Sequence, residues 1–155
     1  MSIENLSREQ LLELFNEELR KFSTETILFH QNVAEKLDLN STDHKCLDII
    51  LRNHPMTAGK LAETTGFTTG TVTGVIDRLE KTGYVYRDKD PNDRRRVIIH
   101  VHSDKVEKEI HPLFTSFSQS MIKLFEKYND QEIKFLFDFV VRSQSILREE
   151  SKKLK

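Results

Sequence analysis

Apolar residues recur every three or four positions through the first quarter of the chain. This spacing matches the turn of an α-helix and predicts one long helix over about residues 7–37. Ser7 followed by Gln10 forms a capping box that marks its start. The apolar stripe consists of Leu12, Phe15, Leu19, Phe22, Phe29, Val33 and Leu37. A helix of this length is not explained by a small core alone, which favours a partner surface.

The pattern continues with a second helix over about residues 41–53. Asn40 or Ser41 begins it, because both side chains are good N-caps. It ends before Pro55, since proline cannot continue a helix without losing a hydrogen bond.

Two short helices follow, separated by the tight turn "TTGFT". Thr57 caps the first, which ends near Gly66, and Thr68 caps the second, with Gly83 just past its end. The apolar stripe of the second is Val72, Val75, Ile76 and Leu79. This spacing is typical of a helix-turn-helix.

The stretches "YVYRD" and "RVIIHVH" flank "KDPNDRR", which contains turn-forming residues. Two β-prone runs around such a turn predict a hairpin. A helix-turn-helix followed by a hairpin is a winged helix, and the hairpin is the wing.

Two terminal helices are expected after the wing. Ser103 begins the first and can cap it, over about 103–128, and Asn129 with Glu132 begins the last. The predicted fold is therefore mainly α with a small β-hairpin wing. We expect a DNA-binding lobe over 39–102.

Residues 1–38 and 103–155 are expected to form a helical dimerisation region. Of the ten phenylalanines, only Phe67 lies in the central lobe. Apolar terminal helices remote from the lobe favour a homodimer over the alternative of one mixed core.

The charge of the chain is distributed unevenly. Its 155 residues carry a net charge of -1, yet residues 78–96 hold seven Lys and Arg against four Asp and Glu, a local charge of +3. Three of these cations are the adjacent Arg94, Arg95 and Arg96 of the wing. A local basic patch beside a helix-turn-helix favours contact with DNA phosphates, although arginines that only solvate a hairpin remain the alternative.

The second short helix is the candidate for insertion into the major groove. Its polar positions remain outside once the apolar stripe faces the core, and threonine can bond a base edge or a phosphate. Gly70 and Gly74 could allow close approach to DNA or could relieve crowding against a neighbouring helix. The candidates on this helix are Thr68, Thr69, Gly70, Thr71, Thr73 and Arg78.

The motifs "KLAETTG", "TVTGVIDRLEKTGYVYR" and "DPNDRRRV" together resemble the MarR (multiple-antibiotic-resistance regulator) family. The resemblance covers about residues 40–102. It implies a homodimeric winged-helix regulator, usually a repressor, that dimerises through its terminal helices. The family's Asp-x-Arg wing motif falls on Asp93 and Arg95, which implies that Arg95 enters the minor groove, with Arg94 and Arg96 on phosphates. Many relatives release DNA when a small ligand binds.

Other chemistry is weakly supported. No nucleophile, base and orienting group assemble, and no Gly-x-Ser-x-Gly motif is present, so we expect no enzyme and no cofactor. His100, His102 and His111 lack the cysteine or carboxylate partners of a zinc site, so no metal is expected. Cys46 is expected to be a buried structural thiol, because it lies in an apolar helix.

The expected partners are a pseudo-palindromic DNA duplex, a second copy of the chain and a possible small effector. The alternative is a winged helix that binds protein and not DNA. One cysteine, no signal peptide and no apolar run of about 18 residues predict a soluble cytoplasmic protein without a membrane partner.

Overall fold

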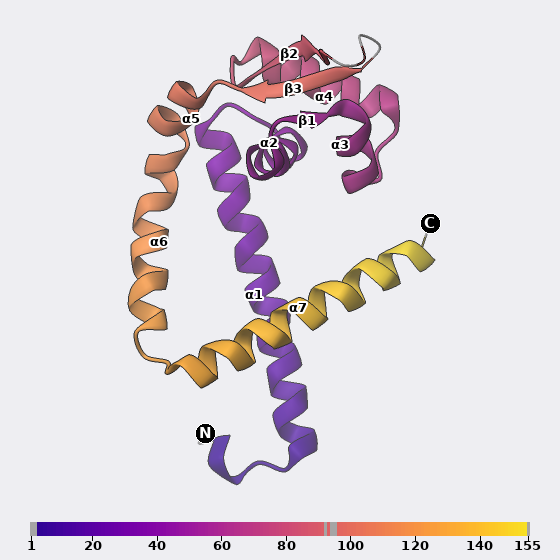
Figure 1. Cartoon of the computed structure of the whole chain (residues 1–155). Helices are drawn as coiled ribbons and strands as arrows, with labels where there is room; N and C mark the ends of the chain where they lie inside the picture. Colours follow the sequence, from indigo (N-terminus) through magenta and orange to yellow (C-terminus); the bar gives the residue numbers. More distant parts are fainter. Residues whose placement is uncertain (1–2, 92, 94–95, 155) are drawn as a thin grey trace. The chain divides into compact units, whose positions relative to one another are not determined.

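The computed structural model of the chain describes residues 3–91, 93 and 96–154. Most of the described residues lie in helices, and the described strands form a small sheet (Figure 1). The chain divides into two compact units, Met1–His111 and Pro112–Lys155. The predicted class, mainly α with a small β wing, is confirmed.

The first unit begins with a short 3-10 helix, Ile3–Asn5, and the long helix α1, Arg8–Lys36. Ser7 caps α1 as predicted: its hydroxyl accepts from the Gln10 backbone N–H at 3.2 Å, and the Gln10 side chain accepts from the Ser7 N–H at 3.0 Å. Only Val33 and Ala34 of α1 are buried. Most of the other apolar residues of α1 are exposed within the chain, among them Leu12, Leu19 and Phe22.

Three helices form the centre of the lobe, and each begins at a cap that the sequence predicts. Asn40, Thr57 and Thr68 accept a backbone N–H from the residue three positions on. Gly66 and Gly83 follow the second and third helices with φ of 71° and 79°, values that a residue with a side chain rarely adopts. The helices are α2 (Ser41–Asn53), α3 (Ala58–Thr65) and α4 (Thr69–Lys81).

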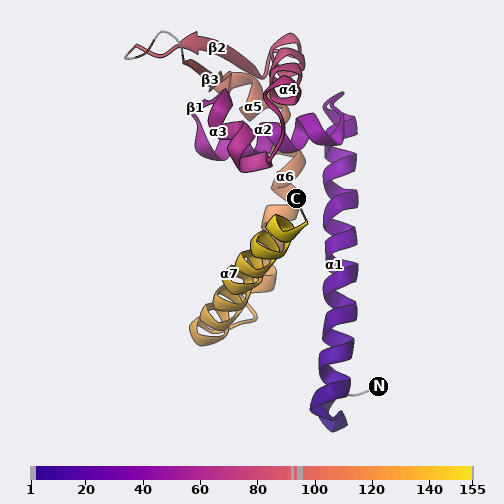
Figure 2. The same cartoon turned by 90° about the vertical axis from the view of Figure 1, so that its right-hand side faces the viewer.

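A three-stranded antiparallel sheet completes the lobe. Strands β2 (Val85–Lys89) and β3 (Val97–Val101) form the predicted hairpin and run out from the lobe side by side (Figure 2). A third strand, β1 (Met56–Thr57), pairs with the other edge of β3. The sequence did not indicate β1, because two residues are too short to show an alternating pattern.

The core of the lobe lies between α2, α3, α4 and the sheet. Which residues belong to this core depends on tertiary packing. The core includes the whole predicted apolar stripe of α4. The largest fully buried side chains are Tyr84, Leu47, Ile50, Leu61, Ile76, Leu79, Ile99, Val72, Val75, Val85 and Cys46.

The expected single helix over 103–128 is wrong. The chain instead forms α5, Ser103–Glu109, and α6, His111–Phe125, which part at Ile110. Pro112 explains the break, since it has no N–H to bond the preceding turn and is tolerated only in a first turn. Ser103 is the first residue of α5, but the expectation that it caps this helix is also wrong: His102 holds the cap position, without a side-chain hydrogen bond.

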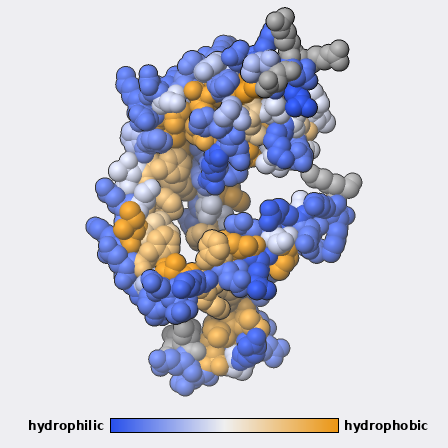
Figure 3. Space-filling model, in the orientation of Figure 1, coloured by the Kyte–Doolittle hydropathy of each residue, from blue (hydrophilic) through white to orange (hydrophobic). Residues whose placement is uncertain are grey.

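The second unit consists of α6 and α7 (Asp130–Lys153). The predicted capping box of Asn129 and Glu132 is confirmed. Neither helix contains a buried residue, and both are described over their full length. Apolar residues accordingly lie at the surface over α1, α6 and α7 (Figure 3).

Candidate nucleic-acid interface

The exposed face of α4 carries a strip of small polar residues. Thr69, Gly70, Thr71 and Thr73 are exposed, as the sequence predicts. Thr68 is exposed too, and its hydroxyl accepts from the Thr71 backbone N–H at 3.2 Å. The N-terminal end of α4 therefore offers hydroxyls, methyls and the positive end of a helix dipole, which suit base edges and phosphates.

Neither glycine of α4 is crowded by a neighbouring helix. A Cβ built at Gly70 would lie 4.0 Å from the Thr68 hydroxyl oxygen, and one at Gly74 would lie 3.4 Å from Arg78 Nη1. The first distance is ordinary contact, and the second involves the end of a flexible side chain. Packing within the chain therefore does not require a glycine at position 70.

Arg78 is held by a buried carboxylate. Its Nε and Nη2 donate to the two oxygens of Asp43 at 2.7 and 2.8 Å, and the Asp43 residue is only 2% exposed. The hydrogen bond from Arg78 to Asp43 raises the pKa of Arg78. Asn40, the cap of α2, also donates to Asp43 at 2.8 Å. From the sequence, Arg78 was predicted only as a DNA contact. In the structure, its ion pair with Asp43 connects α4 to α2.

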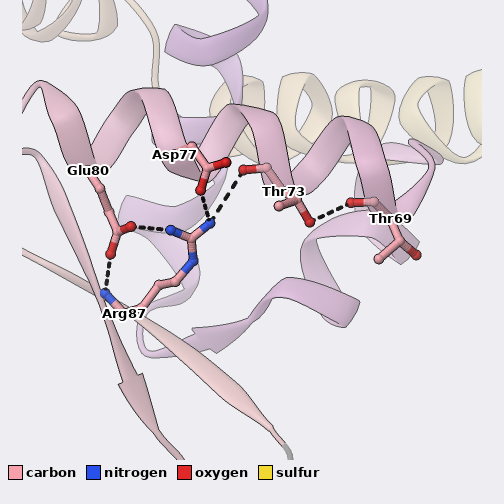
Figure 4. A network of polar contacts seen from close by, with 5 residues as sticks. All are labelled: Thr69, Thr73, Asp77, Glu80 and Arg87. Atoms are coloured by element: carbon pink, nitrogen blue, oxygen red, sulfur yellow. Dashed lines mark hydrogen bonds and ion pairs between the residues drawn. The ribbon is translucent and has the colours of Figure 1, made fainter.

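Arg87 makes a second connection, which sequence patterns did not reveal. It lies on β2, yet its guanidinium donates to Glu80 and Asp77 of α4 and to the Thr73 carbonyl (Figure 4). Glu80 also accepts from the Arg87 backbone N–H at 2.7 Å. The wing strand is thus tied to the exposed face of α4.

The wing carries the remaining candidates. Arg94 and Arg95 lie outside the described residues, so their roles stay predictions. Asp93 accepts the Arg96 backbone N–H through its carbonyl at 2.8 Å, and its carboxylate lies 3.6 Å from Arg96 Nε. The Arg96 side chain is 67% exposed and available to solvent or to a partner.

Comparison with known proteins places this geometry in a family. The MarR family profile matches residues 39–97. The HTH-type transcriptional regulator YcgE of Bacillus subtilis (strain 168) is 46% identical over 155 residues, which cover 100% of this chain and 99% of YcgE. The chain belongs to the MarR family. Its members are helix-turn-helix transcription regulators and not enzymes, as the sequence led us to expect.

Solved structures of MarR-family proteins share the fold. FabT of Streptococcus pneumoniae, in complex with DNA, is 22% identical and covers 89% of this chain and 98% of its own, with a TM-score of 0.70. MarR itself is 25% identical, covers 86% and 98%, and has a TM-score of 0.57. The winged-helix prediction is confirmed.

The described titratable groups away from α4 do not build a metal centre. Among the residues that the structure describes, no three His, Cys, Asp or Glu side chains gather in a way that could hold an ion. His100 and His102 instead pack against Tyr86, with ring centroids 5.1 and 4.8 Å from its ring. No described helix is long and apolar enough to cross a membrane.

Cys46 should be unreactive in the folded protein. Burial, reinforced by the nearby Asp43 carboxylate, raises the pKa of its thiol to about 11, and only 1% of the residue is exposed. Since the thiolate is the reactive form, labelling by a disulfide reagent at pH 8 should be slow and should accelerate with urea as the lobe unfolds. Rapid labelling of one thiol per chain without urea would contradict this burial.

Proposed function

We propose that this MarR-family chain is a homodimeric, sequence-specific DNA-binding regulator, and a repressor that a small ligand releases. The observation that carries the proposal is the exposed strip of Thr69, Gly70, Thr71 and Thr73 at the positive end of α4, beside a wing with three adjacent arginines. A dimer would present two such helices to half-sites about 10 bp apart, one turn of a pseudo-palindromic duplex.

The DNA-binding part of the proposal is tested at Arg95. Arg95→Ala should weaken binding to a duplex, selected from a random pool by the wild-type chain, by about 1–3 kcal/mol if this side chain reads the minor groove. Fluorescence anisotropy at several salt concentrations measures both the affinity and its salt slope. Lys152→Ala, which removes one charge from the end of α7, is the matched control and should leave the affinity unchanged. Equal affinities for Arg95→Ala and the wild type at fixed salt would refute the wing assignment.

Salt also separates this proposal from the alternative of a protein-binding winged helix. Several phosphate contacts give a steep fall of affinity with salt, whereas an apolar protein contact does not. A chain that selects no duplex and binds DNA weakly at every salt concentration would favour the protein-binding alternative.

The homodimer is supported by the exposed apolar surface of the terminal helices. Large side chains of α7 are exposed to an extent unusual in a soluble monomer: Phe135 by 72%, Phe137 by 69% and Leu147 by 69%. Seven large apolar residues of α1 are also exposed by 36% or more: Leu11, Leu12, Phe15, Leu19, Phe22, Ile27 and Leu28. A second copy would cover both faces and explain the length of α1.

Leu147→Glu should therefore shift the chain from dimer to monomer in sedimentation equilibrium, because it places a charge in an apolar contact. Gln144→Glu adds the same charge at an exposed polar position of the same helix and should leave the dimer intact. A wild-type chain that is monomeric at micromolar concentration, or a Leu147→Glu dimer as tight as the control, would contradict this proposal.

Ligand release is supported by a cavity of about 300 Å³ between α1 and α2. His44 lines it and is only 5% exposed. Burial, and then the nearby His30 ring at 5.8 Å, lower the pKa of His44, so its imidazole is neutral at pH 7. A neutral imidazole at the wall of this cavity can exchange a hydrogen bond with a small molecule. Release would be read as lost affinity in the same anisotropy assay.

A further inference from the structure

We propose that Arg87 is a positioning residue that locks the wing onto the recognition helix α4 and so sets the spacing between their two groove contacts. This inference rests on the proposed function, because it assumes that α4 and the wing bind one duplex. It concerns a residue that neither the wing motif nor the polar strip of α4 includes.

The geometry is that of a clamp that spans two turns of α4. Thr73, Asp77 and Glu80 lie four and then three residues apart, which places them along one face of the helix. The Arg87 Nη2 donates to Asp77 at 2.5 Å and to the Thr73 carbonyl at 3.4 Å, and Nη1 donates to Glu80. The planar guanidinium therefore reaches three acceptors from a single point on β2 (Figure 4).

The backbone takes part in the same clamp. Glu80 accepts the guanidinium through one carboxylate oxygen and the Arg87 backbone N–H through the other. Arg87 pairs with Ile99 across the sheet, so fixing Arg87 also fixes the strand β3 that leads back from the arginine-rich turn. The direction of the wing thus depends on contacts to α4 and not on the hairpin alone.

Electrostatics give the clamp a second consequence. Asp77 lies on the exposed side of α4, with 60% of its side chain exposed, on a helix expected to approach phosphates. An unpaired carboxylate there would repel the duplex. Arg87 supplies the opposite charge directly beside Asp77 and Glu80, and thereby reduces that repulsion.

The Arg87 side chain is less exposed than a cation that is expected to touch DNA. Its side chain is 29% exposed, against 67% for Arg96 in the wing. Both terminal nitrogens of Arg87 already donate to α4. We infer that Arg87 acts through Asp77 and Glu80 and does not itself contact a phosphate.

A double-mutant cycle tests this inference in the full-length chain. Arg87→Gln should weaken binding to the selected duplex by tenfold or more, because the wing loses its contacts to α4 and two carboxylates are left unpaired beside the duplex. In a background that carries Asp77→Asn and Glu80→Gln, the same Arg87→Gln change should alter affinity by less than twofold, since the groups through which it acts are gone. Arg87→Lys should not restore binding, because an ammonium cannot make the planar fork.

Arg52→Gln is the matched control, since Arg52 also pairs with a helix carboxylate, Asp48, but at the surface of α2. It should change affinity by less than twofold. An Arg87→Gln loss that is equal in both backgrounds and lowers the salt slope by about one would overturn the inference and make Arg87 a phosphate contact. No loss in either background would overturn it as well.

Hydrogen exchange without DNA keeps the test independent of the proposed function. Arg87→Gln should speed exchange of the β2 and β3 amides while those of α2 and α3 keep their protection, which also shows that the lobe remains folded. Unchanged exchange in the wing would overturn the clamp even if DNA binding is proven. Failure of the wild-type chain to select any duplex would instead refute the proposed function.

Discussion

Replacing Arg78 by leucine should lower the free energy of unfolding by about 1–3 kcal/mol, although the Arg78 side chain itself is 52% exposed. The free energy is lost because the Asp43 carboxylate is left without its cation, and not because Arg78 itself is buried. Asp43 is 2% exposed, and Arg78 supplies two charge-assisted hydrogen bonds to its carboxylate. Without them, the Asp43 carboxylate keeps the hydrogen bond from the Asn40 side chain. The Asp43 backbone N–H still donates to Asn40 at the start of α2. Breaking one side of such a pair is costly because the remaining charge stays out of water.

Urea denaturation, followed by circular dichroism at one protein concentration, measures this loss. Arg52→Leu is the matched control, because Arg52 makes a helical i,i+4 pair with Asp48 and its side chain is 70% exposed. Surface pairs contribute about 0–1 kcal/mol, so this variant should unfold almost as the wild type does. Equal losses for the two variants would show that Asp43 does not depend on Arg78.

The double variant Asp43→Asn with Arg78→Leu sharpens the result. Removal of both charges should recover part of the stability lost by Arg78→Leu alone, since no buried carboxylate is then left without its cation. A double variant less stable than Arg78→Leu would instead indicate that Asp43 acts mainly through Asn40 and the start of α2.

Replacing Leu79 by alanine should also lower the free energy of unfolding by about 3 kcal/mol. Leu79 is fully buried on the inner face of α4, where the helix packs against the rest of the lobe. Truncation removes apolar burial and leaves a cavity that the surrounding helices can only partly fill. The same urea experiment measures the effect.

Leu12→Ala is the control for Leu79→Ala. The substitution is the same, but Leu12 lies on α1 and is 48% exposed within the chain. The Leu79 loss should not depend on protein concentration, because the lobe buries this side chain by itself. Any Leu12 loss should depend on concentration, since only a second copy would bury it. A Leu79→Ala variant within 1 kcal/mol of the wild type would contradict the assigned core.

The sequence alone determined most helix starts in this protein. Ser7 with Gln10, Asn129 with Glu132, and the threonines at 57 and 68 all cap as predicted. Each cap is a contact between residues no more than three positions apart, so the local sequence is enough to predict it. The break at Pro112 is also local. The apolar spacing continues past it, but the proline has no N–H to bond the preceding turn, so the expected 103–128 helix was wrong.

The tertiary structure decided how those elements are joined. Arg78 meets Asp43 across 35 positions, and Arg87 meets Asp77 across 10. No spacing rule relates such residues, because the fold and not the chain brings them together. The same holds for β1, whose two residues are a strand only because β3 lies beside them. From the sequence, Arg78 and the polar strip of α4 were one class of DNA-facing residue. The buried Asp43 distinguishes them, since only a folded lobe can withdraw a carboxylate from water and so oblige an arginine to pair with it.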